Sequence, residues 1–87
     1  KGEYDKAIAY HELALNSDLA TFGEDHPSVA ASYSNLGIAW DKKREHDKAI
    51  GYYELALATM KNVLGDHHPT TQGVQINLER AQSKRDQ

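Results

Sequence analysis

The spacing of apolar residues predicts helices along most of the chain. Apolar or aromatic side chains recur every three or four positions, which is the period of one face of an α-helix. The first stripe consists of Tyr4, Ala7, Ile8, His11, Ala14 and Leu15, and the second of Ala49, Ile50, Tyr53, Ala56, Leu57 and Met60. We therefore expect helices over residues 3–22 and 45–64.

Glycine and proline residues mark where these helices end and where others begin. Gly23 and Gly65 follow the two stripes, and glycine closes a helix in the left-handed conformation without a Cβ penalty. Pro27 and Pro69 come shortly afterwards, and proline suits the first helical position because its missing N–H would be unpaired there. Two further helices are therefore expected, over residues 27–43 and 69–85.

The chain consists of two copies of one 42-residue unit. Residues 3–44 aligned with residues 45–86 give 17 identities in 42 positions, concentrated in the pattern ExDKAIxYxELAL and in the pentapeptide G(E/D)xHP. A fixed period of this length indicates a repeat architecture, in which each unit buries its apolar face against the next.

The two helices that begin at proline differ in the face that should contact a neighbour. In the first copy this face is formed by Val29, Tyr33, Leu36, Gly37 and Trp40, and in the second by Thr71, Gln75, Leu78, Glu79 and Gln82. Gly37 costs about 1 kcal/mol relative to alanine in mid-helix, so we expect another helix to approach it too closely for a side chain. The mostly polar second face is typical of a terminal capping helix.

Composition excludes several classes of protein. Only 16 of 87 residues are Leu, Ile, Val or Phe, which disfavours a single globular core and favours stacked units. The absence of cysteine removes disulfides, thiol catalysis and cysteine zinc sites, and is typical of a cytoplasmic protein. Ten basic against thirteen acidic residues provide no basic field for nucleic acid or an anionic membrane, and no apolar run is long enough to span a bilayer.

The segment NLGIAW followed by EHDKAIGYYELAL resembles helices A and B of a tetratricopeptide repeat. The 42-residue period and the stretch GEDHPSVAASYSNLG are similar to the long repeats of kinesin light chain. The resemblance implies an all-α fold of antiparallel helix-turn-helix repeats in a short right-handed superhelix, whose A helices line a groove for extended peptides of partner proteins. The helix order would be B (3–22), A (27–43), B (45–64) and a capping A (69–85).

Arg44 departs from this family pattern. It stands at the turn between helices A and B, where most such repeats have glycine. A non-glycine residue in the left-handed region costs about 1–2 kcal/mol, so we expect this turn to be weaker than is usual in the family.

Histidine and serine residues invite catalytic and metal hypotheses, but their spacing does not favour them. His26 and His68 recur as part of the repeated pentapeptide, which favours a capping or packing role, and no pair of histidines has the helical spacing of a zinc site. No nucleophile elbow or phosphate-binding glycine loop is present in the sequence. We therefore expect no metal, no cofactor and no enzymatic activity.

The resemblance also implies a binding surface. Asn35 and Asn77 match the helix A asparagine that commonly bonds a peptide backbone in this family, although an asparagine that bridges helices internally is an open alternative. Ile38, Lys42 and Arg80 would tune peptide preference. A basic clamp for a C-terminal carboxylate is incomplete, because Ser34 and Ile38 stand where the clamp has Lys and Asn. The predicted peptide-binding residues are Ser34, Asn35, Ile38, Lys42, Asn77 and Arg80.

Two functional hypotheses follow. The first is a scaffold for protein–protein interaction that binds extended peptides; the alternative is a structural or self-association module without a peptide ligand. Because about three repeats are usually needed for stability, we also expect the two-repeat chain to self-associate. Its end helices would stack between molecules, or the turn at Arg44 would straighten and exchange helices between protomers.

Overall fold

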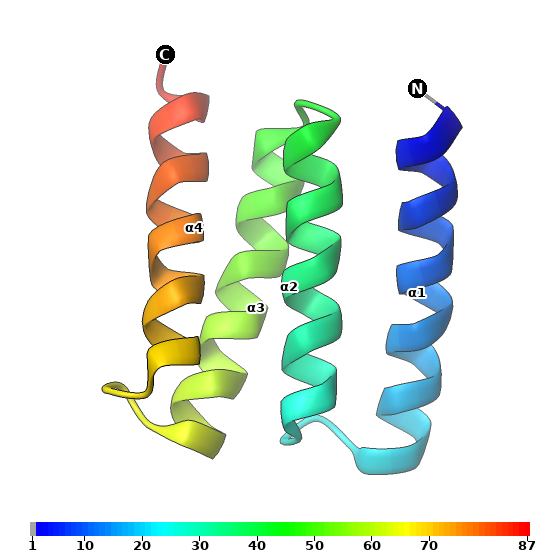
Figure 1. Cartoon of the computed structure of the whole chain (residues 1–87), viewed down its shortest axis with the longest axis vertical. Helices are drawn as coiled ribbons and strands as arrows, with labels where there is room; N and C mark the ends of the chain where they lie inside the picture. The colour runs from blue at the N-terminus through cyan, green and yellow to red at the C-terminus, as the bar shows by residue number, and fades with distance from the viewer. Residues whose placement is uncertain (1) are drawn as a thin grey trace.

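The computed structural model describes residues 2–87 as four α-helices joined by short connections (Figure 1). The helices are α1 (Gly2–Phe22), α2 (Pro27–Lys42), α3 (His46–Leu64) and α4 (Pro69–Arg85). Successive helices run antiparallel, and each packs against the next along the chain. Residues 2–87 contain no strand. The predicted all-α fold of helix-turn-helix repeats is confirmed.

α2 and α4 begin with the same histidine cap. The Nδ1 atom of His26 accepts a hydrogen bond of 3.0 Å from the backbone N–H of Ser28, and Nδ1 of His68 accepts one of 3.1 Å from Thr70. The Phe22 ring stacks on His26 with 4.0 Å between ring centroids. The two histidines therefore satisfy N–H groups that the first helical turn leaves without a partner.

Glycine closes the two helices that precede these caps. Gly23 and Gly65 have positive φ angles of 80° and 90°. With its ψ of 162°, Gly65 occupies a backbone region that only glycine enters readily. Pro27 and Pro69 then start α2 and α4, as the sequence predicts.

The turn between α2 and α3 has the hydrogen-bond pattern of a Schellman motif but lacks its usual glycine. The backbone N–H of Arg44 bonds the carbonyl of Asp41 at 3.0 Å, and that of Glu45 bonds the carbonyl of Trp40 at 2.9 Å. Arg44 has φ 69° and is the only non-glycine residue with positive φ among residues 2–87. Arg44 thus adopts the left-handed conformation at the turn position where the family usually has glycine.

The core forms two layers that share α2. The layer between α1 and α2 contains Ile8, Leu15, Val29, Leu36 and Ala39. The layer among α2, α3 and α4 contains Ala30, Ala49, Ile50, Tyr53, Ala56, Leu57, Met60, Val74, Leu78 and Ala81. Tyr33 and Trp40 are half-buried and pack against both layers. Each repeat unit therefore buries its apolar side chains against its neighbours.

Gly37 lies where a side chain of α3 packs directly against α2, and the neighbouring helix leaves no room for a side chain at this position, as expected. A Cβ atom added at Gly37 would stand 2.6 Å from a ring carbon of Tyr53, a distance that non-bonded carbons do not reach. Tyr53 is only 2% exposed, so its ring has little room to move. The glycine is required by this contact.

The contact face predicted for α2 is divided between two neighbours. Val29 and Leu36 belong to the layer with α1, whereas Gly37 meets Tyr53 of α3. The corresponding expectation for α4 is wrong in part, because Thr71 and Leu78 are buried. They hold the positions of Val29 and Leu36, which face the preceding helix. The other three residues of the predicted face, Gln75, Glu79 and Gln82, are partly or fully exposed.

Candidate peptide-binding surface

The residues predicted to bind a peptide all lie on α2 and α4. Asn35, Lys42 and Arg80 are exposed, and Ile38 is 37% exposed. The remaining two, Ser34 on α2 and Asn77 on α4, are half-buried.

Three of these residues come together in a shallow groove between α1 and α2. Asn35, Ile38 and Lys42 follow one another at spacings of three and four, which places them along one edge of α2. Tyr4 and His11 lie on the α1 side of the same groove, whose hollow measures about 160 Å³. An amide, an aliphatic side chain and an ammonium group therefore stand in a row opposite two aromatic rings.

The other three predicted residues do not form the wall of this groove. Ser34 lies on an adjacent side of α2, and the groove is lined by α1 and α2 alone. Asn77 and Arg80 occupy on α4 the positions that Asn35 and Ile38 occupy on α2. The predicted set is therefore divided between two helices.

Asp41 ties α2 to both later helices. Its Oδ1 atom is 2.8 Å from Nδ1 of His46, and its Oδ2 atom accepts a hydrogen bond of 3.1 Å from Nζ of Lys84. The carboxylate side chain is only 16% exposed. Asp41 therefore connects α2, α3 and α4. α4 continues to Arg85, and Lys84 near its end is held by this hydrogen bond to Asp41.

A second ion pair joins α1 to the end of α2. Nζ of Lys43 donates a hydrogen bond of 2.6 Å to Oδ1 of Asp5. This hydrogen bond, together with the positive charge of Lys43, holds the pKa of the Asp5 carboxyl below its usual value. Lys42, the next residue, stays exposed at the edge of the groove and makes no ion pair within 4.0 Å in the described part of the chain. Its charge is available to a ligand.

Sequence reasoning missed the contribution of α1 to the groove. Tyr4, Ala7 and His11 were assigned to a packed stripe, and all three line the groove. Tyr4 is 39% exposed, whereas Ile8 is only 6% exposed. The spacing of Tyr4, Ala7 and His11 at intervals of three and four was the available signal, since it defines one edge of the stripe instead of its centre.

Two other features are absent from residues 2–87. Residues 2–87 contain no group of three or more His, Cys, Asp or Glu side chains placed to hold a metal ion. Within the same residues, no helix has the length and apolar character needed to cross a membrane.

Comparison with known proteins identifies the family. No curated protein matches the chain. The family model described as tetratricopeptide repeat matches residues 1–62, which include α1, α2 and most of α3. The match covers more than half of the chain, and the antiparallel helix pairs have the arrangement that the sequence resemblance implied. The chain therefore belongs to the tetratricopeptide repeat family.

Proposed function

We propose that the chain is a protein-interaction module that binds an extended peptide along its A helices and carries out no catalysis. The observation that supports this proposal is the groove in which Asn35, Ile38 and Lys42 stand in a row. Family membership supports a role in protein interaction in general. We expect the module to act in the cytoplasm and to need no cofactor.

The chemistry of the groove suits an extended chain. The carboxamide of Asn35 both donates and accepts hydrogen bonds, so it can pair with the backbone of any peptide regardless of its side chains. Ile38 provides apolar contact next to it, and Lys42 would attract a carboxylate of the peptide. Asn77 and Arg80 would repeat this arrangement on α4.

Replacing Asn35 by alanine tests the proposal. A peptide selected from a random library should bind the Asn35→Ala variant at least 1 kcal/mol more weakly, because its backbone loses a two-way hydrogen-bond partner. The same loss is expected for Asn77→Ala if the peptide reaches α4. Isothermal titration calorimetry would measure both dissociation constants, with Gln72→Ala on the exposed side of α4 as the control.

Two results would contradict this proposal. One is a library that yields no peptide with a dissociation constant below about 1 mM, a value that corresponds to only about 4 kcal/mol of binding free energy. The other is a bound peptide whose affinity is unchanged in both asparagine variants, which would favour an internal bridging role for these side chains.

The Arg44 turn favours self-association as a second function. A left-handed arginine costs about 1–2 kcal/mol, and a turn that straightened into one continuous α2–α3 helix would release this strain. The neighbouring residues Lys42, Lys43 and Glu45 are good helix formers. Straightening would exchange helices between two protomers, and stacking of end helices is the other route to an oligomer.

Light scattering at several protein concentrations separates these routes. We expect oligomers at micromolar concentration, and Arg44→Gly should remove the exchanged dimer because glycine adopts the turn without strain. Stacked oligomers should persist in this variant. A wild-type chain that stays monomeric at micromolar concentration would contradict both routes.

A further inference from the structure

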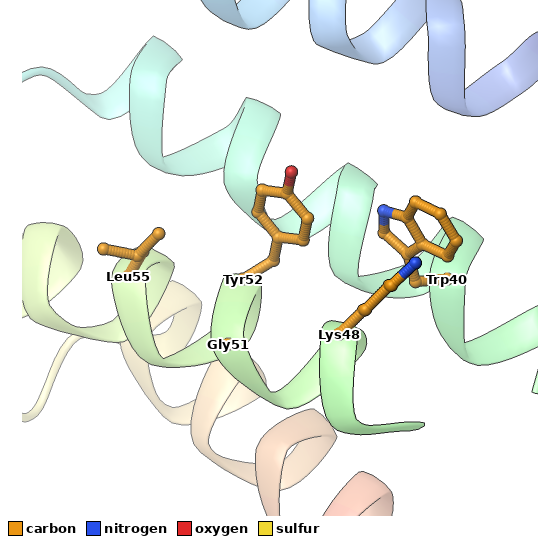
Figure 2. A pocket seen from close by; sticks show the side chains of 5 residues that line it. All are labelled: Trp40, Lys48, Gly51, Tyr52 and Leu55. Carbon is orange, nitrogen blue, oxygen red and sulfur yellow. The ribbon is translucent and has the colours of Figure 1, made fainter. Parts of the chain in front are cut away.

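A second hollow is lined by α2 and α3 and shares no residue with the α1–α2 groove. Trp40 of α2 forms one end of it, and Lys48, Gly51, Tyr52 and Leu55 line it from α3 (Figure 2). The space measures about 490 Å³ and is open to solvent. We call these five residues the outer groove.

The outer groove is mostly apolar. Two aromatic rings and one leucine side chain line it, and Leu55 is 48% exposed although it lies next to buried residues of α3. Figure 2 shows the side chains of Leu55, Tyr52 and Trp40 one after another along the groove. Exposed apolar side chains gathered beside a charged group are typical of an interaction site rather than of ordinary surface.

Gly51 keeps the centre of the outer groove open. It lies in the middle of α3, where glycine is a poor helix former, and a Cβ atom at this position would meet nothing within 4 Å. Gly37, in contrast, is required because the Tyr53 ring fills the space beside it. Packing therefore gives no reason for Gly51, and a large side chain at this position would stand in the outer groove.

The charge at the Trp40 end is positive and has no partner. Nζ of Lys48 lies 4.3 Å from the centroid of the Trp40 ring and within 4.0 Å of no carboxylate in residues 2–87. Lys43 also lies over this ring, at 5.3 Å, but its charge is taken up by Asp5. Lys48 is therefore the cation of the outer groove that is free to pair with a ligand.

The indole of Trp40 adds a second unsatisfied donor. Its Nε1 atom is buried and makes no hydrogen bond in the described part of the chain. Figure 2 shows this nitrogen on the edge of the ring that is turned toward Tyr52. A buried donor without an acceptor is unfavourable, so the fold leaves one unpaired polar group beside the outer groove.

The opposite end of the outer groove is less suited to an anion. Burial raises the pKa of the Tyr52 phenol, and the negative charge of Glu12 on α1 raises it further. A carboxylate bound near Tyr52 would be repelled by Glu12. The charges therefore orient an occupant, with its acidic group toward Lys48 and its apolar group toward Tyr52 and Leu55.

We propose that the outer groove binds an acidic segment of a partner protein, which places an apolar side chain over Gly51 and a carboxylate beside Lys48. This surface is independent of the peptide-binding groove between α1 and α2. The two grooves share no lining residue.

Trp40 is the only tryptophan in the chain, so its fluorescence reports on the outer groove directly. The probe is a synthetic twelve-residue peptide, blocked at both ends, in which pairs of leucines are flanked by glutamates. Two control peptides carry lysine in place of every glutamate or alanine in place of every leucine. We expect the acidic leucine peptide to shift Trp40 emission with saturation, and each control peptide to bind at least about tenfold more weakly, which corresponds to about 1.4 kcal/mol.

The chain supplies matched control variants. Gly51→Leu fills the outer groove, whereas Gly73→Leu makes the same change at an exposed position of α4 that lines neither groove. Lys48→Glu reverses the charge, and Lys61→Glu does so at an exposed position in the last turn of α3. We expect Gly51→Leu and Lys48→Glu to weaken binding at least about fivefold and the two control variants, Gly73→Leu and Lys61→Glu, to change it less than about twofold, because the control positions do not line the outer groove. Leucine is a better helix former than glycine, so the melting temperature of Gly51→Leu should not fall.

Three results would overturn the proposal. The first is equal binding of the acidic and the lysine peptide, and the second is an equal effect of Gly51→Leu and Gly73→Leu. The third is a Trp40 emission that depends on protein concentration without peptide and loses this dependence in Gly51→Leu, because the occupant would then be a second copy of the chain.

Discussion

α2 and α4 hold the same position in the repeat but have different surroundings. α2 packs against α1 on one side and α3 on the other, whereas the main contacts of α4 are with α3. The side that faces the preceding helix is buried in both, with Leu36 in α2 and Leu78 in α4. The other side carries Gly37 in α2 and the exposed Glu79 in α4.

The comparison separates two requirements that act on one helix. Contact with the preceding helix buries a leucine in both copies, since that neighbour is present for both. Contact with the following helix demands glycine at position 37, because the Tyr53 ring fills the space beside it. The equivalent residue Glu79 of α4 meets no such ring, and its carboxylate accepts a hydrogen bond of 3.0 Å from Nε2 of Gln75. The difference between the copies therefore reports which neighbours each helix has.

Placing at Gly37 the glutamate that α4 has at the equivalent position should give the largest loss of stability. Gly37→Glu should lower the free energy of unfolding by more than about 3 kcal/mol, because the side chain meets the Tyr53 ring and a charge is buried. This is a large share of the roughly 4–13 kcal/mol expected for a chain of this length. Urea unfolding followed by circular dichroism would measure the loss.

The matched substitution on α4 should be mild. Glu79→Gly is expected to cost about 1 kcal/mol, which is the intrinsic helix penalty of glycine on an exposed face. Equal losses in the two variants would show that the environments of α2 and α4 are alike, and this would break the comparison.

High pH should cause a smaller loss of stability through Tyr53, the residue that packs against Gly37. Burial, assisted by the charge of Asp41, raises the pKa of the Tyr53 phenol from 10.0 to about 12. Below pH 10 the phenol is neutral in both states and stability is unaffected. Between pH 10 and about 12 only the unfolded chain ionises, so the free energy of unfolding should fall by roughly 1–2 kcal/mol and then level off.

The Tyr53→Phe variant isolates this effect from the ionisation of other groups. The wild type should lose more stability than Tyr53→Phe between pH 9 and 12 in parallel urea titrations. His11, the equivalent residue on α1, cannot give this signal because it has no phenol. Parallel curves for the two proteins would place the Tyr53 hydroxyl in contact with solvent.

A substitution in the turn after α2 should have a small effect on stability, and of the opposite sign. Arg44→Gly should raise the free energy of unfolding by about 1 kcal/mol, since the positive φ angle of 69° no longer strains a side chain. Lys43→Gly is the control, because Lys43 has φ −78° and gains nothing from glycine. Stabilisation by both variants, measured in urea at a protein concentration that keeps the chain monomeric, would argue against strain at Arg44.

Much of the fold was predictable because the repeat carries its signals in local patterns. Glycine at the helix ends, proline at the helix starts and the 42-residue period each have one physical meaning. Gly37 was also predictable as a contact point, because a mid-helix glycine is costly unless a neighbour is close. These features depend on spacing along the chain alone.

The sequence did not predict in the same way which residues of a helix are packed in the core and which line a groove. Whether Tyr4 is buried or lines a groove depends on the angle at which α1 crosses α2, and periodicity does not contain this angle. The hydrogen bond between Lys84 and Asp41 joins residues 43 positions apart, so no local sequence pattern predicts it. Ser34 and Asn35 are adjacent in sequence and lie on different sides of α2, which separated one predicted site residue from its neighbours.

Tyr33 and Trp40 each touch both layers of the core. Loss of the α1–α2 layer would therefore expose rings that also support the layer formed with α3 and α4, and the two layers should melt as one cooperative transition. Tyr33 and Trp40 thus couple the two layers, so the molecule should unfold in one step as a protein with a single core does.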